Sequence, residues 1–272
     1  MERDEAQQFE QPFKLVTERV KPYRDKLSGQ MHESRYWLFW DKREKFYQRI
    51  GLLDKVLVSS IVTKYLTFSF FPVGWVYSHQ LKVFAFTGSE FFSVLQSSFH
   101  DVWARSFSSS LGETMRYSTS AAFDTFPWPN ELVQLGGIGS AVHDCRARLM
   151  AQQREGFTTI YNRFHDPDEA SGDIQKLRKL HVEMDNAVAA AYGWSDLDLG
   201  HGFHETKQGV RYTICEPARR DVLARLLKLN HERYAEEVKQ GLHEKKKPNE
   251  TKGNKKAEAA DTGRTLYGED DA

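Results

Sequence analysis

The chain carries polar side chains of the kinds that read DNA, placed beside aromatic residues and short apolar segments. Arg and Lys can donate to guanine O6 and N7, and Gln can pair with adenine, whereas cations on phosphates add affinity without sequence information. The candidates for base contacts on strands and turns are Lys64, Tyr65, Thr67, His79, Gln80, Arg116 and Tyr117. The candidates for phosphate contacts from a helix are Lys42, Arg43, Lys45 and Arg49. Any one of these residues could equally be an ordinary solvent-exposed polar side chain with no role in DNA binding.

An enzyme that methylates DNA would need sequence motifs of a different kind. Binding of S-adenosylmethionine requires a glycine-rich loop at a helix N-terminus, and adenine methylation also requires an Asn-Pro-Pro-Tyr-like loop that holds a flipped base. The sequence has no such loop, and its one glycine cluster, Gly136-Gly137-Ile138-Gly139, does not follow a clear strand. An interrupted helix is favoured there over a nucleotide site. We therefore expect no catalytic residue and no cofactor in this chain.

The sequence gives little support for a catalytic or structural metal site. Cleavage of DNA with Mg²⁺ needs an Asp followed closely by Glu-x-Lys or Asp-x-Lys. Asp168 begins such a pattern, but the triplet Glu237-Val238-Lys239 lies far downstream, in a predicted helix. The stretch from Asp196 to His204 could hold a small metal site, but histidines in such a loop are more often simply polar. We expect neither a nuclease centre nor a bound metal.

Composition bounds the class of protein. The 272 residues, 40% apolar and 13% aromatic, suffice for two modest domains or one large one. No apolar run approaches the roughly 20 residues that span a bilayer, and the polar start is unlike a signal peptide. Two cysteines in such a chain are expected to be unpaired. We expect a cytoplasmic protein with no membrane partner.

Charge is unevenly distributed although the net charge is zero. Between Lys14 and Lys64 there are 12 basic and 6 acidic residues, whereas from Pro129 onward 22 basic residues face 24 acidic ones. A basic N-terminal half suits a surface that faces a polyanion. A solvated face would look the same, so charge alone does not decide between them.

The N-terminal half predicts an α+β domain. After a polar leader (residues 1–12), aromatic residues at helical spacing predict a helix over Glu33–Ile50. Four apolar segments separated by Pro and Gly predict an antiparallel meander, at 56–58, 65–71, 75–77 and 81–86. Capping-box spacing between Thr87 and Glu90 predicts a helix whose stripe extends to Phe107. Pro127 and Pro129 then mark a domain boundary.

The C-terminal half predicts helices throughout. One or two cover 131–164, another has a seam from Ile174 to Ala191, and Glu216-Pro217 opens the last. From about residue 243 almost no apolar residues remain, which is typical of disorder. The predicted organisation is an α+β domain (13–129), a small all-α domain (130–242) and a disordered tail (243–272).

The order of several longer segments resembles the target-recognition region of MmeI-like and type IIG restriction–modification enzymes, and of related phage-defence DNA methyltransferases. Four segments carry the resemblance in the first half: Val20-Lys21-Pro22-Tyr23-Arg24, Arg35-Tyr36-Trp37, Asp54-Lys55-Val56-Leu57-Val58 and Leu95 to Ala104. Arg116-Tyr117 and Phe126-Pro127-Trp128-Pro129 follow, and then Tyr161 to Pro167 and Ala191-Tyr192-Gly193-Trp194, which are similar to the helical domain after that region.

The resemblance implies binding of double-stranded DNA and selection of a site for adenine-N6 methylation. It places S-adenosylmethionine on a separate or missing methyltransferase domain, and a methyltransferase subunit is the second partner expected. Two origins fit the missing catalytic half, a stand-alone recognition subunit and a non-functional remnant of a longer gene. A protein–protein adaptor, which binds independently of salt and DNA, is the alternative from another class. An autonomous metal-dependent enzyme would need a carboxylate cluster that the sequence does not assemble.

Overall fold

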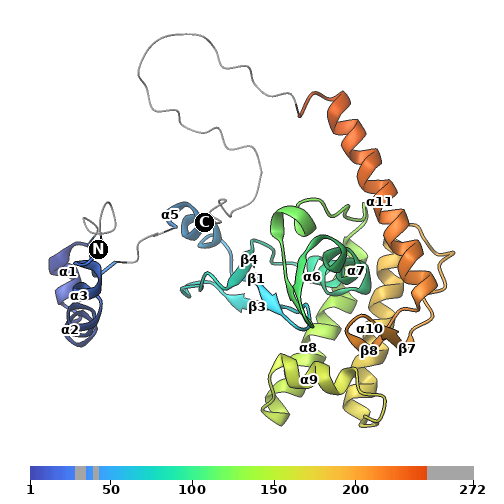
Figure 1. Ribbon diagram of the computed structural model, residues 1–272, viewed down its shortest axis with the longest axis horizontal. Coiled ribbons are helices and arrows are strands. Elements are labelled where there is room, and N and C mark those ends of the chain that lie inside the picture. The colour runs from blue at the N-terminus through green and yellow to red at the C-terminus, as the bar shows by residue number, and fades with distance from the viewer. Residues whose placement is uncertain (28–34, 39–42, 244–272) are drawn as a thin grey trace. The chain divides into compact units, whose positions relative to one another are not determined.

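The computed structural model describes residues 1–27, 35–38 and 43–243. Two compact units divide between Leu52 and Leu53 (Figure 1). Across the described ranges, no helix is both long and apolar enough to span a bilayer. The predicted disordered tail lies, apart from His243, outside the described residues.

The first unit contains short helices. They are α1 (Arg3–Gln7), α2 (Glu10–Arg19), α3 (Lys21–Arg24) and α5 (Glu44–Ile50). The prediction of one helix over 33–50 is wrong, because 35–38 form a turn and Arg43 has a left-handed φ of 46°. Tyr36 and Trp37 instead pack edge to face at 5.2 Å, with Phe13 against both. These aromatic side chains form a small core rather than a helical stripe.

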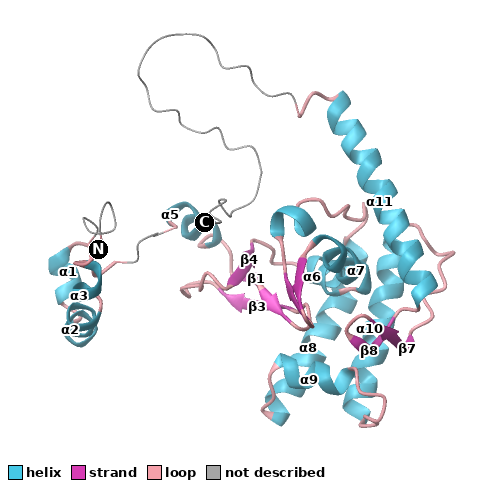
Figure 2. Cartoon of the chain, in the orientation of Figure 1, coloured by secondary structure: helices cyan, strands magenta, loops and turns pink. Residues whose placement is uncertain are grey.

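The second unit begins with a three-stranded antiparallel sheet in the order β3-β1-β4 (Figure 2). Its strands are β1 (Lys55–Ser60), β3 (Phe68–Pro72) and β4 (Leu81–Phe84). The predicted meander order is wrong, since β1 lies in the middle, and 75–77 form no strand. The continuous apolar run Val56-Leu57-Val58 fits cover on both faces of β1, because successive side chains point to opposite faces and all three are buried.

Two helices replace the single helix predicted after this sheet. They are α6 (Ser89–Gln96) and α7 (Ser98–Phe107), and Gly88, not Thr87, is the N-cap of the first. Ser97 ends α6 and caps α7, where its Oγ accepts the His100 N–H. A second antiparallel sheet, in the order β2-β6-β5, follows from β2 (Val62–Thr63), β5 (Ser109–Leu111) and β6 (Thr114–Arg116). A π-helix, η1 (Thr119–Phe123), leads to the Pro-rich segment.

The C-terminal half is helical apart from one hairpin. A 3₁₀ turn, η2 (Val133–Leu135), precedes α8 (Gly136–Gln153), α9 (Phe157–Phe164), α10 (Gly172–Ala191) and α11 (Glu216–Lys239). The helices predicted from the 174–191 seam and from Glu216-Pro217 are confirmed. The hairpin of β7 (Gly202–Thr206) and β8 (Gly209–Thr213) corrects the expectation of an all-α segment. The α+β fold class is confirmed.

One hydrophobic core joins the residues before and after Pro129. The core cluster runs from Leu57 to Leu226. Its polar centre is the buried Arg146 of α8, which donates to Gln96 Oε1 (2.9 Å), Tyr161 Oη (3.2 Å) and the Phe68 carbonyl. Arg146 thus ties β3, α6, α8 and α9 together. A functional division at 129/130 stays a prediction.

Candidate nucleic-acid interface

Ile61, between β1 and β2, joins two segments that carry predicted base contacts. Its N–H donates to the Gln80 carbonyl at 2.9 Å, and its carbonyl accepts the Tyr117 N–H at 2.7 Å. The neighbouring Val62 pairs with Arg116 across β2 and β6. Gln80 and Arg116, which are distant in sequence, therefore lie on hydrogen-bonded segments. We call residues 78–80, 61–64 and 113–117 the recognition edge.

His79 and Gln80 form the exposed end of this edge. The Ser78 Oγ accepts the Gln80 N–H at 3.2 Å, and the Ser78 carbonyl accepts the Leu81 N–H at 3.1 Å, so the turn is held by local hydrogen bonds. The Gln80 side-chain amide lies 2.9 Å from His79 Nε2. Arg116 is exposed at the end of β6. Both long polar residues are therefore exposed on backbone that hydrogen bonds hold in place.

Lys64 is held by an ion pair with Glu113 in the β5–β6 turn, at 3.0 Å. The hydrogen bond between them raises the pKa of Lys64 and lowers the pKa of Glu113. The pair presents little net charge. A contact of Lys64 with DNA would therefore have to compete with Glu113.

The two tyrosines predicted as DNA contacts are core residues. Tyr65 is buried, donates to Asn162 Oδ1 at 2.8 Å and stacks on His165 with a 5.0 Å centroid separation. Tyr117 is 1% exposed, and its hydroxyl lies 2.8 Å from His100 Nε2. Burial raises the pKa of Tyr117 well above its usual value and lowers the pKa of His100 to about 3. Both rings serve packing: Tyr117 is almost fully enclosed, and Tyr65 is 7% exposed with its ring stacked on His165.

The remaining predicted contacts lie elsewhere. Thr67 is half-buried just before β3, and it is not part of the recognition edge. Arg43 is half-buried and Lys45 and Arg49 are exposed on or beside α5, in the first compact unit. Their phosphate contacts stay predictions. Lys42 lies outside the described residues.

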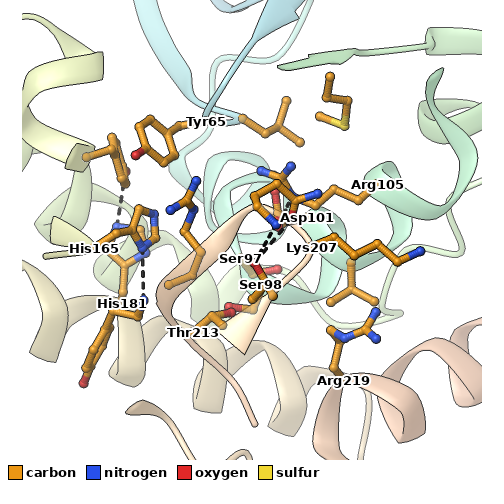
Figure 3. Close-up of a pocket in the computed structure, with 18 of the residues that line it drawn as sticks. Tyr65, Ser97, Ser98, Asp101, Arg105, His165, His181, Lys207, Thr213 and Arg219 are labelled. Atoms are coloured by element: carbon orange, nitrogen blue, oxygen red, sulfur yellow. Dashed lines mark hydrogen bonds and ion pairs between the residues drawn. The ribbon is translucent and has the colours of Figure 1, made fainter. Parts of the chain in front are cut away.

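A cleft of about 970 Å³, which sequence reasoning missed, lies between α7, the two hairpins and the start of α11 (Figure 3). Its cationic lining residues are Arg105, Lys207, Arg211, Arg219 and Arg220. Three of them are paired: Arg105 with Asp101 at 2.8 Å, and Arg219 and Arg220 with Glu216 at 2.6 and 2.7 Å. A signal was available in Lys207-Gln208-Gly209, because a polar pair followed by Gly is typical of a hairpin turn.

Two histidines of the cleft, His165 and His181, are neutral at physiological pH. Burial, with a smaller contribution from the positive charge of Arg211, lowers the pKa of His165 to about 2. Burial lowers the pKa of His181 to about 4. His201 approaches Asp185 at 2.9 Å, and Asp196 is paired with Arg225. Among the described residues, no three His, Cys, Asp or Glu side chains are grouped so that they could share a metal ion.

Comparison with known proteins identifies the first half of the chain. Residues 2–130 match the family model of the MmeI target recognition domain. This portion of the chain, which contains the whole recognition edge, is similar to that target recognition domain. The family resemblance expected from sequence is thereby confirmed.

A solved structure shares the fold. It is the type IIL restriction-modification enzyme MmeI in complex with DNA, with a TM-score of 0.51 and 18% identity over 82% of this chain. The chain spans 27% of that enzyme. The likeness extends beyond residue 130 and so includes part of the helical half. No curated protein sequence matches the chain.

Proposed function

We propose that this chain is the DNA-reading part of a restriction–modification or phage-defence system whose methyltransferase acts on adenine N6. The observation that carries the proposal is the target recognition domain at residues 2–130, whose rigid edge presents Gln80 and Arg116. The related MmeI structure, solved in complex with DNA, supports duplex DNA as the target.

The chemistry of the edge suits base reading in the major groove. An Arg guanidinium can donate two hydrogen bonds to guanine O6 and N7, and a Gln amide can both donate to and accept from adenine. Each such bidentate contact discriminates against a wrong base by about 1–3 kcal/mol. Because the backbone of the edge is fixed by hydrogen bonds, little ordering is needed before the side chains meet the bases.

Modification of the DNA belongs to a partner in this proposal. A methyltransferase domain or subunit would bind S-adenosylmethionine and receive the flipped adenine, while this chain selects the site. The reading role itself needs no group for methyl transfer. Such a system acts in the cytoplasm, where the DNA is.

Selection from a randomised duplex pool, at two salt concentrations, tests the proposal. We expect an enriched motif and an affinity that falls steeply with salt. Gln80→Ala and Arg116→Ala should each relax the motif at one or two positions. Gln175→Ala and Arg148→Ala remove the same side-chain types from exposed positions on α10 and α8, so they should leave the motif unchanged.

Two outcomes would contradict the proposal. If the wild-type chain retains no duplex at low salt, then it does not read DNA by itself. If Gln80→Ala and Arg116→Ala enrich the wild-type motif, the recognition edge is not where bases are read. Salt-insensitive binding to a protein, without DNA binding, would instead favour the adaptor.

A further inference from the structure

The β7–β8 hairpin lies outside the matched recognition domain, yet it forms one wall of the cleft. The opposite wall includes Ser110, Glu113 and Thr114 of the β5–β6 hairpin, which belongs to the recognition domain. Thr114 lines the cleft, and Arg116 follows two residues later on the same strand, so both side chains leave β6 on one face. A duplex that contacted Arg116 would therefore lie two residues of one strand away from the cleft lining.

Lys207 and Arg211 are the cleft cations without a carboxylate partner. In the part of the chain that the structure describes, no carboxylate lies within the 4.0 Å salt-bridge distance of either. The carboxylates of Asp101, Glu113, Asp185 and Glu216 are each engaged by another residue. Glu205 also lines the cleft, but no salt bridge joins it to Lys207 or Arg211 among the described residues. The hairpin thus contributes two cations that form no salt bridge, beside the carboxylate of Glu205 and within electrostatic reach of Glu113.

Both cations are carried on rigid backbone. Thr206 pairs with Gly209, so Lys207 and Gln208 lie in the turn, and Gly209 follows them with a positive φ of 86°, as in hairpin loops that end in a left-handed residue. The Thr206 hydroxyl donates to the Gly209 carbonyl at 2.7 Å and accepts the Gln208 N–H at 3.1 Å. Arg211 lies 5.3 Å above the Tyr65 ring, and one of its N–H groups donates to the Val210 carbonyl. Its other donors remain available, because a guanidinium has five.

We propose that this cleft binds a backbone phosphate of the duplex that the recognition edge reads, with Lys207 and Arg211 as the phosphate ligands. The inference rests on the proposed function. It gives the C-terminal half a direct role in DNA binding. This contact would add affinity but would not distinguish one base sequence from another. The ligand is the phosphodiester backbone rather than a base, because a compact ammonium on a hairpin turn and a guanidinium stacked on a tyrosine are both suited to anionic oxygens.

The experiment measures the affinity of the full chain for the enriched duplex across a series of KCl concentrations. The test variants are Lys207→Gln and Arg211→Gln. Lys179→Gln is the matched control, because it removes the same charge from an exposed site on α10. Each test variant should lower the slope of log K against log salt by about 0.9, and it should weaken binding severalfold near ~0.1 M salt. The preferred motif should not change, since phosphate contacts carry no base information.

A scan of neutral methylphosphonates along the duplex locates the phosphate. One backbone position should weaken wild-type binding, whereas Lys207→Gln should be insensitive to the same replacement. If Lys207→Gln and Arg211→Gln match Lys179→Gln in slope and affinity, the inference is overturned while the proposed function stands. A changed motif in either variant would make that residue a base reader and would also overturn it. If the wild-type chain retains no duplex, both proposals fail together.

Discussion

Replacing Gly139 with alanine should destabilise the second compact unit, because α8 crosses α6 at that glycine. A Cβ there would lie 2.1 Å from the Ser89 carbonyl oxygen and 2.4 Å from Ser93 Oγ. Ordinary contacts are about 3.5 Å or more, so the helices would have to move apart by more than about 1 Å. The Ser89 oxygen belongs to the backbone and cannot rotate away. Ser93 Oγ is itself fixed by a 2.8 Å hydrogen bond to the Leu135 carbonyl.

The magnitude follows from two opposing effects. Overpacking a tight core costs about 1–3 kcal/mol, and the better helix propensity of alanine returns up to about 1 kcal/mol. We therefore expect Gly139→Ala to lower the free energy of unfolding by about 1–2 kcal/mol. Urea unfolding followed by circular dichroism measures this change as a lower midpoint at constant slope.

Gly137→Ala is the matched control for this prediction. Gly137 precedes Gly139 in the first turn of α8, and a Cβ there would meet no atom within 4 Å. The same substitution should therefore be neutral or stabilise by up to about 1 kcal/mol. If both variants shift the midpoint in the same direction, then the close contact between α6 and α8 is not present in solution, and the reasoning is refuted.

Two further predictions concern buried polar residues. The pKa of His100 is about 3 in the fold, below its ordinary value of 6.5. Its neutral form therefore stabilises the fold fully above that ordinary value, and stability declines by about 1 kcal/mol per pH unit below it. Urea midpoints across pH should show a shallower decline in His100→Gln; equal slopes would contradict this. Arg146→Met removes donors from Gln96, Tyr161 and Phe68, so unfolding should be easier by about 3 kcal/mol. A midpoint within error of wild type would reject this account of the core.

Local patterns predicted those elements whose apolar residues all face one core. The seam from Ile174 to Ala191 became α10, and Glu216-Pro217 opened α11. The same argument failed where aromatic residues serve several neighbours. Tyr36 and Trp37 pack on Phe13 in a turn, and Ser97 divides a stripe that looked continuous into α6 and α7. Helical spacing of apolar residues does not show where the chain turns, and it does not show where one helix ends and the next is N-capped.

The site was predicted in part for a related reason. Gln80 and Arg116 are exposed, as expected for long amide-bearing or charged side chains, but Arg116, which was predicted in a loop, ends strand β6. Tyr65 and Tyr117 were wrongly predicted to be accessible, since a tyrosine suits both a surface and a core. Burial decides between these, and burial depends on partners such as Asn162 and His100 that are distant in sequence.

Composition and periodicity, which are local properties of the sequence, predicted an α+β half followed by helices, and the order of its segments carried the resemblance to a target-recognition region. The tertiary structure decided which residues can act together. It placed Ile61 between Gln80 and Tyr117, and it brought the β7–β8 hairpin opposite the β5–β6 hairpin across one cleft. It also assigned Gly139 to a close helix crossing rather than to a nucleotide loop. Such pairings depend on how distant surfaces fit together, and no local pattern in the chain encodes that fit.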